Sequence, residues 1–194
     1  QPQTEIRRVG LWCWRDRVIR VIPYTPEMIE RAHGSALRLG LLKNSITKGR
    51  GSLAGYLGQY AVAARLGVNP NEDSFNHDFL NYGKRIEVKT KRRTVAPIGT
   101  HDVSIAATSM HQSPDLYIFV SLEFERLESG HGGPRQYAGL KKVWVVGQKP
   151  PKEYLNEARL WKEGEVDPTN GFVTKSDMFN LPIDRLDPVT GDVI

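Results

Sequence analysis

Cysteine is almost absent from this chain, and long apolar runs are missing. Cys13 is the one cysteine among 194 residues, which rules out an internal disulfide, and no cysteine or histidine grouping has the spacing of a zinc site. The longest apolar runs, such as residues 116–122, have the length of a strand and are too short to cross a bilayer or act as a secretory signal. We therefore expect a protein of the reducing cytoplasm with no membrane partner.

The sequence also lacks internal repeats and low-complexity segments. With 39% hydrophobic and 25% charged residues, its 194 residues suffice for one well-buried core but not for two comfortable domains. We expect a single domain over residues 1–194, with a basic N-terminal arm at 1–24, a core at 43–148 and a C-terminal wrap at 149–194.

Positive charge is concentrated in the first half of the chain. Residues 1–93 hold 17 Lys and Arg against 8 Asp and Glu, whereas residues 94–194 hold 10 against 14. A basic region of this kind attracts polyanions. The plain alternative is that these side chains are scattered over solvated faces.

Apolar periodicity and capping patterns place the secondary structure. The sequence Thr25-Pro26-Glu27 predicts the start of a helix that ends near Gly40, and the alternation at 18–22 indicates an edge strand or a hairpin. The expected helices are 25–42, 53–66 and 151–160, and the expected later strands are 101–106, 116–124 and 142–147, with a short helical or turn connection at 108–114.

The segment 77–93, HDFLNYGKRIEVKTKRR, carries the pattern with the most chemical content. Side chains alternate between the two faces of a strand, so Glu87 and Lys89 share one face. A turn at 82–84 separates this strand from Asp78, and pairing the two strands as a hairpin brings the Asp78 carboxylate near Glu87. Two carboxylates and an ammonium group are therefore expected to converge.

This grouping has the chemistry of a metal site. Two adjacent carboxylates repel one another unless a cation lies between them, and oxygen ligands favour hard ions such as Mg²⁺ or Mn²⁺. Such an ion lowers the pKa of bound water and polarises a phosphoryl group, while a neighbouring lysine orients or deprotonates the attacking water. An acid, an apolar residue and a lysine in succession also occur by chance on solvated strands, so the tripeptide alone is a weak signal.

The arrangement resembles the PD-(D/E)XK nuclease superfamily, whose signature is an Asp at the end of one strand and Glu-x-Lys in the next, here Asp78 and Glu87-Val88-Lys89. Upstream, KNSITKGRGSLAGYLGQYAVAARLGV looks like the glycine-containing helix that precedes these strands in many members. Downstream, HQSPDLYIFVSLEF and KKVWVVGQ look like the helix and two strands that complete the core. The resemblance covers roughly residues 43–148, and the order of the parts is more specific than any one motif.

The resemblance implies an α/β fold with a restriction-endonuclease-like core, in which a central mixed β-sheet is flanked by α-helices. It implies hydrolysis of DNA phosphodiester bonds with Mg²⁺, or Mn²⁺ as a substitute, and a homodimer as one option. Asp78 and Glu87 would bind the metal with the Val88 carbonyl as a further ligand, and Lys89 would position or activate the water. DNA rather than RNA is inferred by analogy with the superfamily alone.

One position departs from the superfamily pattern. Where many members carry a Glu on the preceding helix, this chain has Gln59, within the sequence GYLGQ. An amide has nearly the shape of a carboxylate without its charge, so it can hold a water or a phosphate oxygen while weakening metal affinity. We count Gln59 with the catalytic group, and the site either works with two acidic ligands or is impaired.

Basic and polar residues around the motif are candidates for DNA contact. The glycine-rich segment 46–52 is either a phosphate cradle at a helix start or a connector capped by Ser52, and it lacks the Gly-Lys-Ser/Thr ending of a nucleotide-binding P-loop. Asp115 is at least as good a candidate for bracing a strand start as for substrate contact. The predicted nucleic-acid contacts are Lys48, Arg50, Lys91, Arg92, Arg93 and Gln112.

Three other functions stay open. A Holliday-junction resolvase would use the same residues on four-way DNA, and a nucleic-acid-binding protein with an impaired site would bind DNA without cutting it. A structural or interaction domain would do neither. The charge asymmetry argues against a structural or interaction domain, while Gln59 is consistent with an impaired nucleic-acid-binding protein.

Overall fold

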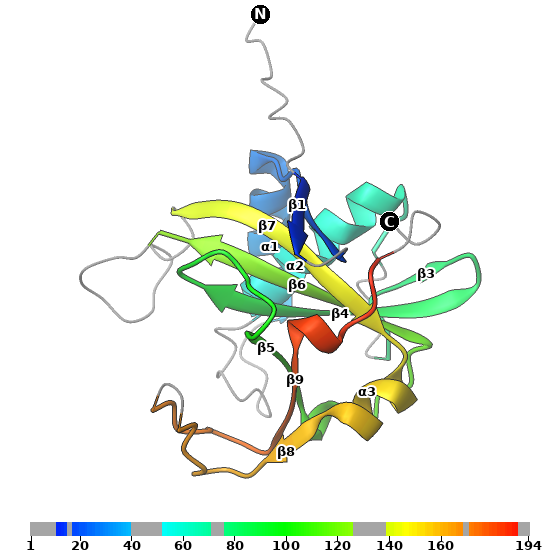
Figure 1. The fold of residues 1–194 in the computed structure, drawn as a ribbon. Coiled ribbons are helices and arrows are strands. Elements are labelled where there is room, and N and C mark those ends of the chain that lie inside the picture. The colour runs from blue at the N-terminus through cyan, green and yellow to red at the C-terminus, as the bar shows by residue number, and fades with distance from the viewer. Residues whose placement is uncertain are drawn as a thin grey trace, which may run out of the picture.

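Two β-sheets and three α-helices form the part of the chain that the computed structural model describes, which is residues 11–14, 17–39, 52–70, 76–125, 139–168 and 171–189 (Figure 1). The larger sheet contains β1 (Leu11–Trp14), β2 (Arg17–Ile22), β3 (Phe79–Asn81), β4 (Lys84–Arg93), β6 (Leu116–Phe124) and β7 (Leu140–Lys149). The smaller sheet contains β5 (Asp102–Ala106), β8 (Arg159–Trp161) and β9 (Met178–Pro182). The helices are α1 (Pro26–Leu39), α2 (Ser52–Leu66) and α3 (Pro151–Glu157), with short 3-10 turns η1 (Ala107–Ser109) and η3 (Ile183–Arg185).

The larger sheet is mixed, with the strand order β1-β2-β7-β6-β4-β3. β4 and β6 run parallel, which places Glu87 beside Tyr117 and Lys89 beside Phe119, and the other neighbouring strands in this sheet are antiparallel. The expected α/β fold with a mixed sheet is therefore confirmed. The segment 18–22 forms a hairpin with β1, and β2 lies inside the sheet between β1 and β7.

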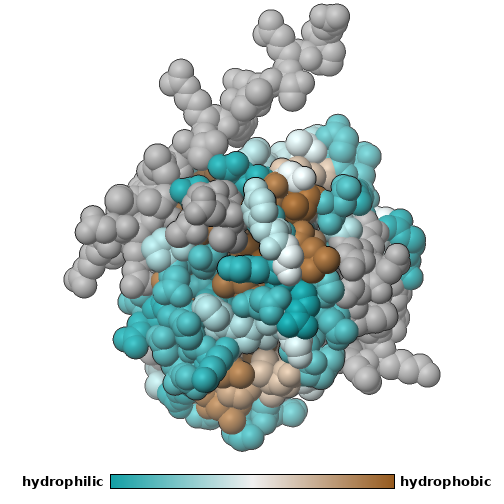
Figure 2. All heavy atoms as spheres, turned by 90° about the vertical axis from the view of Figure 1, so that its right-hand side faces the viewer, coloured by the Kyte–Doolittle hydropathy of each residue, from teal (hydrophilic) through white to brown (hydrophobic). Residues whose placement is uncertain are grey.

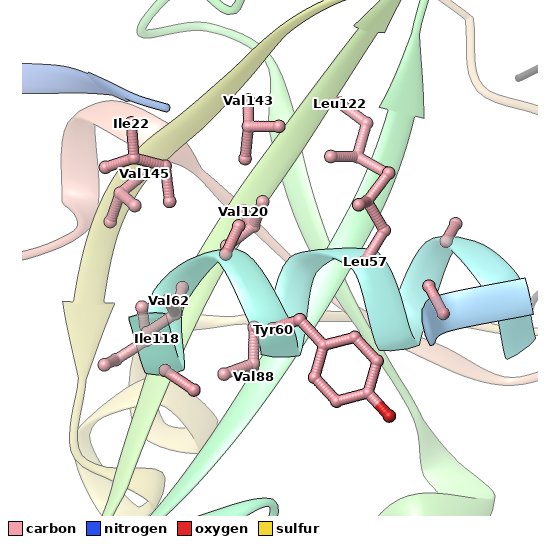
Figure 3. Packing of buried hydrophobic residues seen from close by; sticks show 14 of the residues in the cluster. Ile22, Leu57, Tyr60, Val62, Val88, Ile118, Val120, Leu122, Val143 and Val145 are labelled. Atoms are coloured by element: carbon pink, nitrogen blue, oxygen red, sulfur yellow. The ribbon is translucent and has the colours of Figure 1, made fainter. Parts of the chain in front are cut away.

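One face of the larger sheet is covered by α2, which is apolar around most of its circumference and therefore suits a buried position. Figure 3 shows Leu57 and Val62 of this helix lying over strand side chains that include Val88, Ile118 and Leu122. α1 packs beside α2, and the hydroxyl oxygens of Ser35 and Tyr60 are 2.6 Å apart. Burying this face supplies the apolar contact that fixes α2 above β4.

The helix boundaries follow their capping signals. The Thr25 hydroxyl accepts a hydrogen bond from the Met28 amide at 3.3 Å, and Pro26 is the first residue of α1, as the sequence predicted. Within the described residues, no helix combines the length and the apolar character needed to cross a membrane.

The opposite face of the larger sheet carries a second apolar cluster, covered by the smaller sheet and α3. Tyr117 and Phe119 of β6 contact Tyr154 of α3, with ring centroids 6.0 and 5.3 Å from it. The Tyr154 hydroxyl donates to the Phe179 carbonyl of β9 at 2.7 Å. β6 is thus buried on both faces, which explains why nearly all of its residues are apolar.

The connection at 108–114, expected as a short helix or a turn, is confirmed, since it contains the end of the 3-10 turn η1 and the turn residues 110 and 111. The helix expected over 151–160 ends at Glu157, since Ala158 is extended (ψ 141°) and the next three residues pair with β9 instead. The strand expected at 101–106 is present but belongs to the smaller sheet, where it pairs with β9.

Candidate active site

The candidate site lies at the base of the β3–β4 hairpin. The strands pair antiparallel with Phe79 opposite Ile86, and Tyr82 and Gly83 form the two-residue turn. Both turn residues have positive φ, +47° and +77°, as a type I′ turn requires. The hairpin predicted from the sequence is therefore present, and it brings the residues before β3 alongside the middle of β4.

Asp78 comes directly before β3 and is held by the β4 backbone. Its own amide donates to the Ile86 carbonyl at 2.8 Å, and its carboxylate accepts a hydrogen bond from the Val88 amide at 2.6 Å. β3 pairs with β4 only as far as Ile86, so the Asp78 side chain takes the place of a strand partner for Val88. The carboxylate is thereby fixed beside β4.

Glu87 and Lys89 lie on the face of β4 that looks toward the smaller sheet. The Lys89 ammonium donates to Glu87 Oε1 at 2.7 Å and to Gln112 Oε1 at 2.8 Å. It also lies 5.9 Å from the centre of the Tyr117 ring. The two charged side chains are 7% and 17% exposed, for Glu87 and Lys89 respectively, so this ion pair is largely shielded from water.

The charges of Glu87 and Lys89 both act on the Asp78 carboxyl group. Burial of the Asp78 carboxyl group and the neighbouring Glu87 charge raise the pKa of Asp78 to about 8, against the opposing effects of the Val88 amide and the Lys89 ammonium. Asp78 as a residue keeps some exposure, although its carboxyl group is buried. An acid in this environment gains from a cation placed beside it. The convergence of Asp78, Glu87 and Lys89 expected from the sequence is found in the structure.

Gln59 reaches the same place from α2. Its side-chain amide donates to the backbone carbonyl of Asp78 at 3.2 Å, and the residue is 5% exposed. The preceding Gly58 makes this approach possible, because a Cβ atom at position 58 would clash with Thr90 Oγ1 on β4 and lie 3.2 Å from Thr90 Cβ. The amide therefore braces the strand end that carries Asp78.

The donor set fits a hard divalent cation. Carboxylate oxygens of Asp78 and Glu87 are the ligands such ions prefer, and the Val88 carbonyl faces the same strand edge as its amide, toward Asp78. Within the described residues, no group of three or more His, Cys, Asp or Glu side chains is suitably placed for a metal ion. A metal here would depend on two carboxylates together with carbonyl or amide oxygens.

The basic residues that follow Lys89 divide between two faces. Lys91 donates to Ser104 Oγ at 2.8 Å, and Arg93 donates to Ser121 Oγ at 3.1 Å and to the Asp102 carbonyl at 2.6 Å. Burial, and then the nearby Arg93 charge, lower the pKa of Lys91 to about 8. These two side chains join the larger sheet to β5, whereas Arg92 is exposed. Their predicted DNA contacts stay predictions, and Lys48 and Arg50 lie outside the described residues.

Arg85 and Asp115 form a contact that sequence reasoning anticipated only in part. The Arg85 side chain donates to both Asp115 oxygens, at 2.9 and 3.1 Å, and the Arg85 amide donates to Oδ2 at 2.8 Å. The pair ties the start of β4 to the start of β6, so Asp115 has the bracing role that the sequence allowed. Tyr117, which lies under Lys89, was not predicted for the site, because a tyrosine inside an apolar run gives no signal beyond core packing.

Comparisons with protein families, with curated proteins and with solved structures find no match for this chain.

Proposed function

We propose that the protein is a metal-dependent DNA nuclease that hydrolyses phosphodiester bonds with the residues of the PD-(D/E)XK pattern. The observation that carries the proposal is the gathering of Asp78, Glu87 and Lys89 at the base of one hairpin, where the charges of Glu87 and Lys89 both affect the pKa of Asp78. A restriction-endonuclease-like core is part of the proposal. The parallel pairing of β4 with β6 and the packing of α2 over β4 support it.

Asp78 and Glu87 would hold Mg²⁺, with Mn²⁺ as a substitute and the Val88 carbonyl as a further ligand. A bound ion of this kind supplies charge stabilisation for the phosphate and lowers the pKa of a water molecule. The Asp78 carboxylate is pre-positioned for this by the Val88 amide. Burial of two nearby carboxyl groups is costly in the metal-free protein and becomes favourable when a cation neutralises them.

Lys89 would position the attacking water and stabilise the charge that develops on the phosphate oxygens. The Lys89 ammonium has three N–H donors. Glu87 and Gln112 accept two of these hydrogen bonds, and the third donor would be directed at the substrate. Gln112 was predicted to contact nucleic acid. In the free protein its side-chain oxygen accepts a hydrogen bond from Lys89. Because Lys89 is 17% exposed, it remains within reach of solvent and of a phosphate.

DNA fits the charge of this half of the chain, which holds 17 Lys and Arg against 8 Asp and Glu over residues 1–93. Arg92 is the exposed residue of the described basic run and lies on the opposite face of β4 from Glu87 and Lys89, so it would contact a phosphate of the DNA away from the site itself. We further propose a cytoplasmic enzyme, in keeping with its single cysteine, with a homodimer as the form that would cut both strands.

Plasmid digestion tests the proposal. Supercoiled DNA is incubated with the protein and Mg²⁺, Mn²⁺ or Ca²⁺, and the nicked and linear products are measured. We expect cutting with Mg²⁺ and Mn²⁺, and a loss of at least about 100-fold in Glu87→Gln and Lys89→Ala. Lys152→Ala, which removes an exposed lysine from α3, serves as the matched control and should cut like the unaltered protein.

Metal binding gives a second measurement that does not depend on cutting. Mn²⁺ should raise the midpoint of thermal unfolding in the unaltered protein and in Lys89→Ala, but much less in Glu87→Gln. DNA binding without cutting under every ion would favour the impaired nucleic-acid-binding protein, to which Gln59 points. Preference for four-way over linear DNA would favour the resolvase, and the absence of both metal and DNA binding would overturn the proposal.

A further inference from the structure

An aromatic side chain stands at the tip of the hairpin that carries the candidate site. Tyr82 is 91% exposed, the highest value among the large hydrophobic side chains of the described residues. It occupies the first position of the two-residue turn, opposite the end where Asp78 and Glu87 lie. The hairpin therefore presents a tyrosine ring to the surroundings at one end and the carboxylates at the other.

The turn itself does not explain a tyrosine at this position. Tyr82 has φ +47°, a left-handed conformation that favours Asn, Asp or Gly and is unfavourable for a bulky residue. Since the side chain is 91% exposed, packing within the described part of the chain offers little compensation. A tyrosine here is better explained by contact with another molecule.

The tip and the site share one continuous face. Leu80 and Arg85 are cross-strand partners, and Arg85 is two residues from Glu87, so these side chains project from the same face of the hairpin. Leu80 is 55% exposed, and Lys84, which lies at the tip on the opposite face of β4, is exposed as well. From the Asn81–Lys84 pair, which flanks the turn that carries Tyr82, to Glu87 the hairpin rises about 10 Å, and this length is about three base steps of a DNA strand.

The side of the molecule that bears the hairpin faces the viewer in Figure 2, and hydrophilic residues dominate its coloured surface. A polar surface with an exposed lysine and a projecting aromatic ring is suited to nucleic acid, because cations contact phosphates and the ring stacks on a base. In an intact duplex, both faces of each base are covered by its neighbours. An open base face exists at a fork, a flap or another junction between paired and unpaired DNA.

We infer that Tyr82 stacks on the unstacked base at a junction between double-stranded and single-stranded DNA, and so places the scissile phosphate at the Asp78–Glu87 site. This inference rests on the proposed nuclease function and adds the substrate class to it. The protein recognises DNA structure with the tip of the hairpin and cuts about three nucleotides from the junction.

The test compares a forked duplex with a fully paired duplex of the same length, each carrying 2-aminopurine at the position of the junction. Binding is measured by fluorescence with Ca²⁺ in place of Mg²⁺, using the full chain. Tyr82→Asn removes the ring but gives the Asn-Gly sequence that this turn type prefers, so the variant should fold at least as well. Tyr82→Phe keeps the ring, and Phe172→Asn removes a 52% exposed aromatic residue located elsewhere as the control.

We expect the unaltered protein, Tyr82→Phe and Phe172→Asn to bind the fork similarly and to change the 2-aminopurine signal. Tyr82→Asn should bind the fork about tenfold more weakly and bind the paired duplex unchanged. With Mg²⁺, cleavage of the fork should fall about three nucleotides from the junction, and this preference should be lost in Tyr82→Asn.

The outcomes separate the two proposals. If the unaltered protein binds and cuts DNA but Tyr82→Asn has the same preference for the fork, the inference about Tyr82 is wrong and the nuclease remains. Equal weakening on both DNAs would also overturn it, because the tyrosine would then contribute without regard to an open base. If the unaltered protein neither binds nor cuts either DNA, the nuclease proposal fails and the inference fails with it.

Discussion

The side-chain amide of Gln59 donates a hydrogen bond to the backbone carbonyl of Asp78 at 3.2 Å, across the contact between α2 and the β3–β4 hairpin. Gln59, where the proposed PD-(D/E)XK pattern would place a Glu, thus contacts the main chain of the predicted metal ligand. An amide can donate this bond and a carboxylate cannot. We therefore expect the charge at position 59 to affect both the stability of the site and the metal affinity that the proposed function requires.

Gln59→Glu should have opposite effects on these two properties. Without metal, the lost donor and the added negative charge beside Asp78 should lower the free energy of unfolding by about 1–3 kcal/mol. With Mg²⁺, the extra carboxylate should raise the rate of DNA cutting by at least about tenfold. Urea unfolding in EDTA and plasmid digestion measure the two quantities.

Gln59→Met is the matched control for that change, because it removes the amide without adding charge. It should lose stability and gain no activity. Equal rates of cutting by Gln59→Glu and the unaltered protein would remove the role given to position 59.

Two glycines of α2 offer a second test of how the helix is positioned. A Cβ atom at position 58 would lie 3.2 Å from Thr90 Cβ and Cγ2, whereas one at position 55 would have no neighbour within 4 Å. Gly58→Ala should therefore cost about 1–3 kcal/mol of stability and reduce DNA cutting as Gln59 shifts. Gly55→Ala should instead stabilise the protein by up to about 1 kcal/mol, because alanine favours a helix.

Thermal unfolding and plasmid digestion of the two variants check this pair. A loss of stability in Gly55→Ala as large as in Gly58→Ala would show that close packing against Thr90 is not what requires the glycine.

The lowered pKa of Lys91 predicts that the free energy of unfolding depends on pH. Its pKa is lowered to about 8 by burial and by Arg93, against opposing effects of Asp102 and Asp167, whereas in the unfolded chain a lysine has a pKa of about 10.4. Between these values the unfolded chain binds more protons, so this residue makes stability rise with pH from about 8 to about 10.4. Below pH 8 the protonated side chain is a buried charge that lowers stability.

Lys91→Met should remove this contribution. The difference between the free energies of unfolding, unaltered protein minus variant, should increase as pH rises from 8 to 10 and be constant from pH 6 to 7, as measured by urea unfolding. Lys152→Met, which alters an exposed lysine, should show no such trend. A difference independent of pH would mean that Lys91 keeps its ordinary pKa.

The hairpin and the grouping of its charged residues could be predicted from the sequence, because both depend on residues that are close together in the chain. Strand alternation put Glu87 and Lys89 on one face, and a turn with Gly83 brought Asp78 beside them. The long apolar strand β6 and the helix α2 were predicted for similar reasons. These elements are determined by residues close together in the chain.

The partners of the basic run were not accessible in this way. In the sequence, the run from Lys91 to Arg93 looks like charged side chains on a solvent-exposed strand. In the structure, Lys91 contacts Ser104, and Arg93 contacts Ser121 and the Asp102 carbonyl. Those contacts exist because β5 lies in a second sheet, paired with β9 from the end of the chain. The pairing of segments nearly 80 residues apart leaves no periodic signal in either one, so the sequence predicted the strand at 101–106 but not its partner β9.

The burial of β6 on both faces has a consequence for how the chain comes together. During synthesis, LYIFVSLEF leaves the ribosome before β7, α3 and β9, which later cover it. A strongly apolar segment of this length, in which Glu123 is the one charged residue, associates readily with other exposed apolar segments before it is covered. We expect the newly made protein to depend on chaperones or on a low local concentration until its last third has emerged.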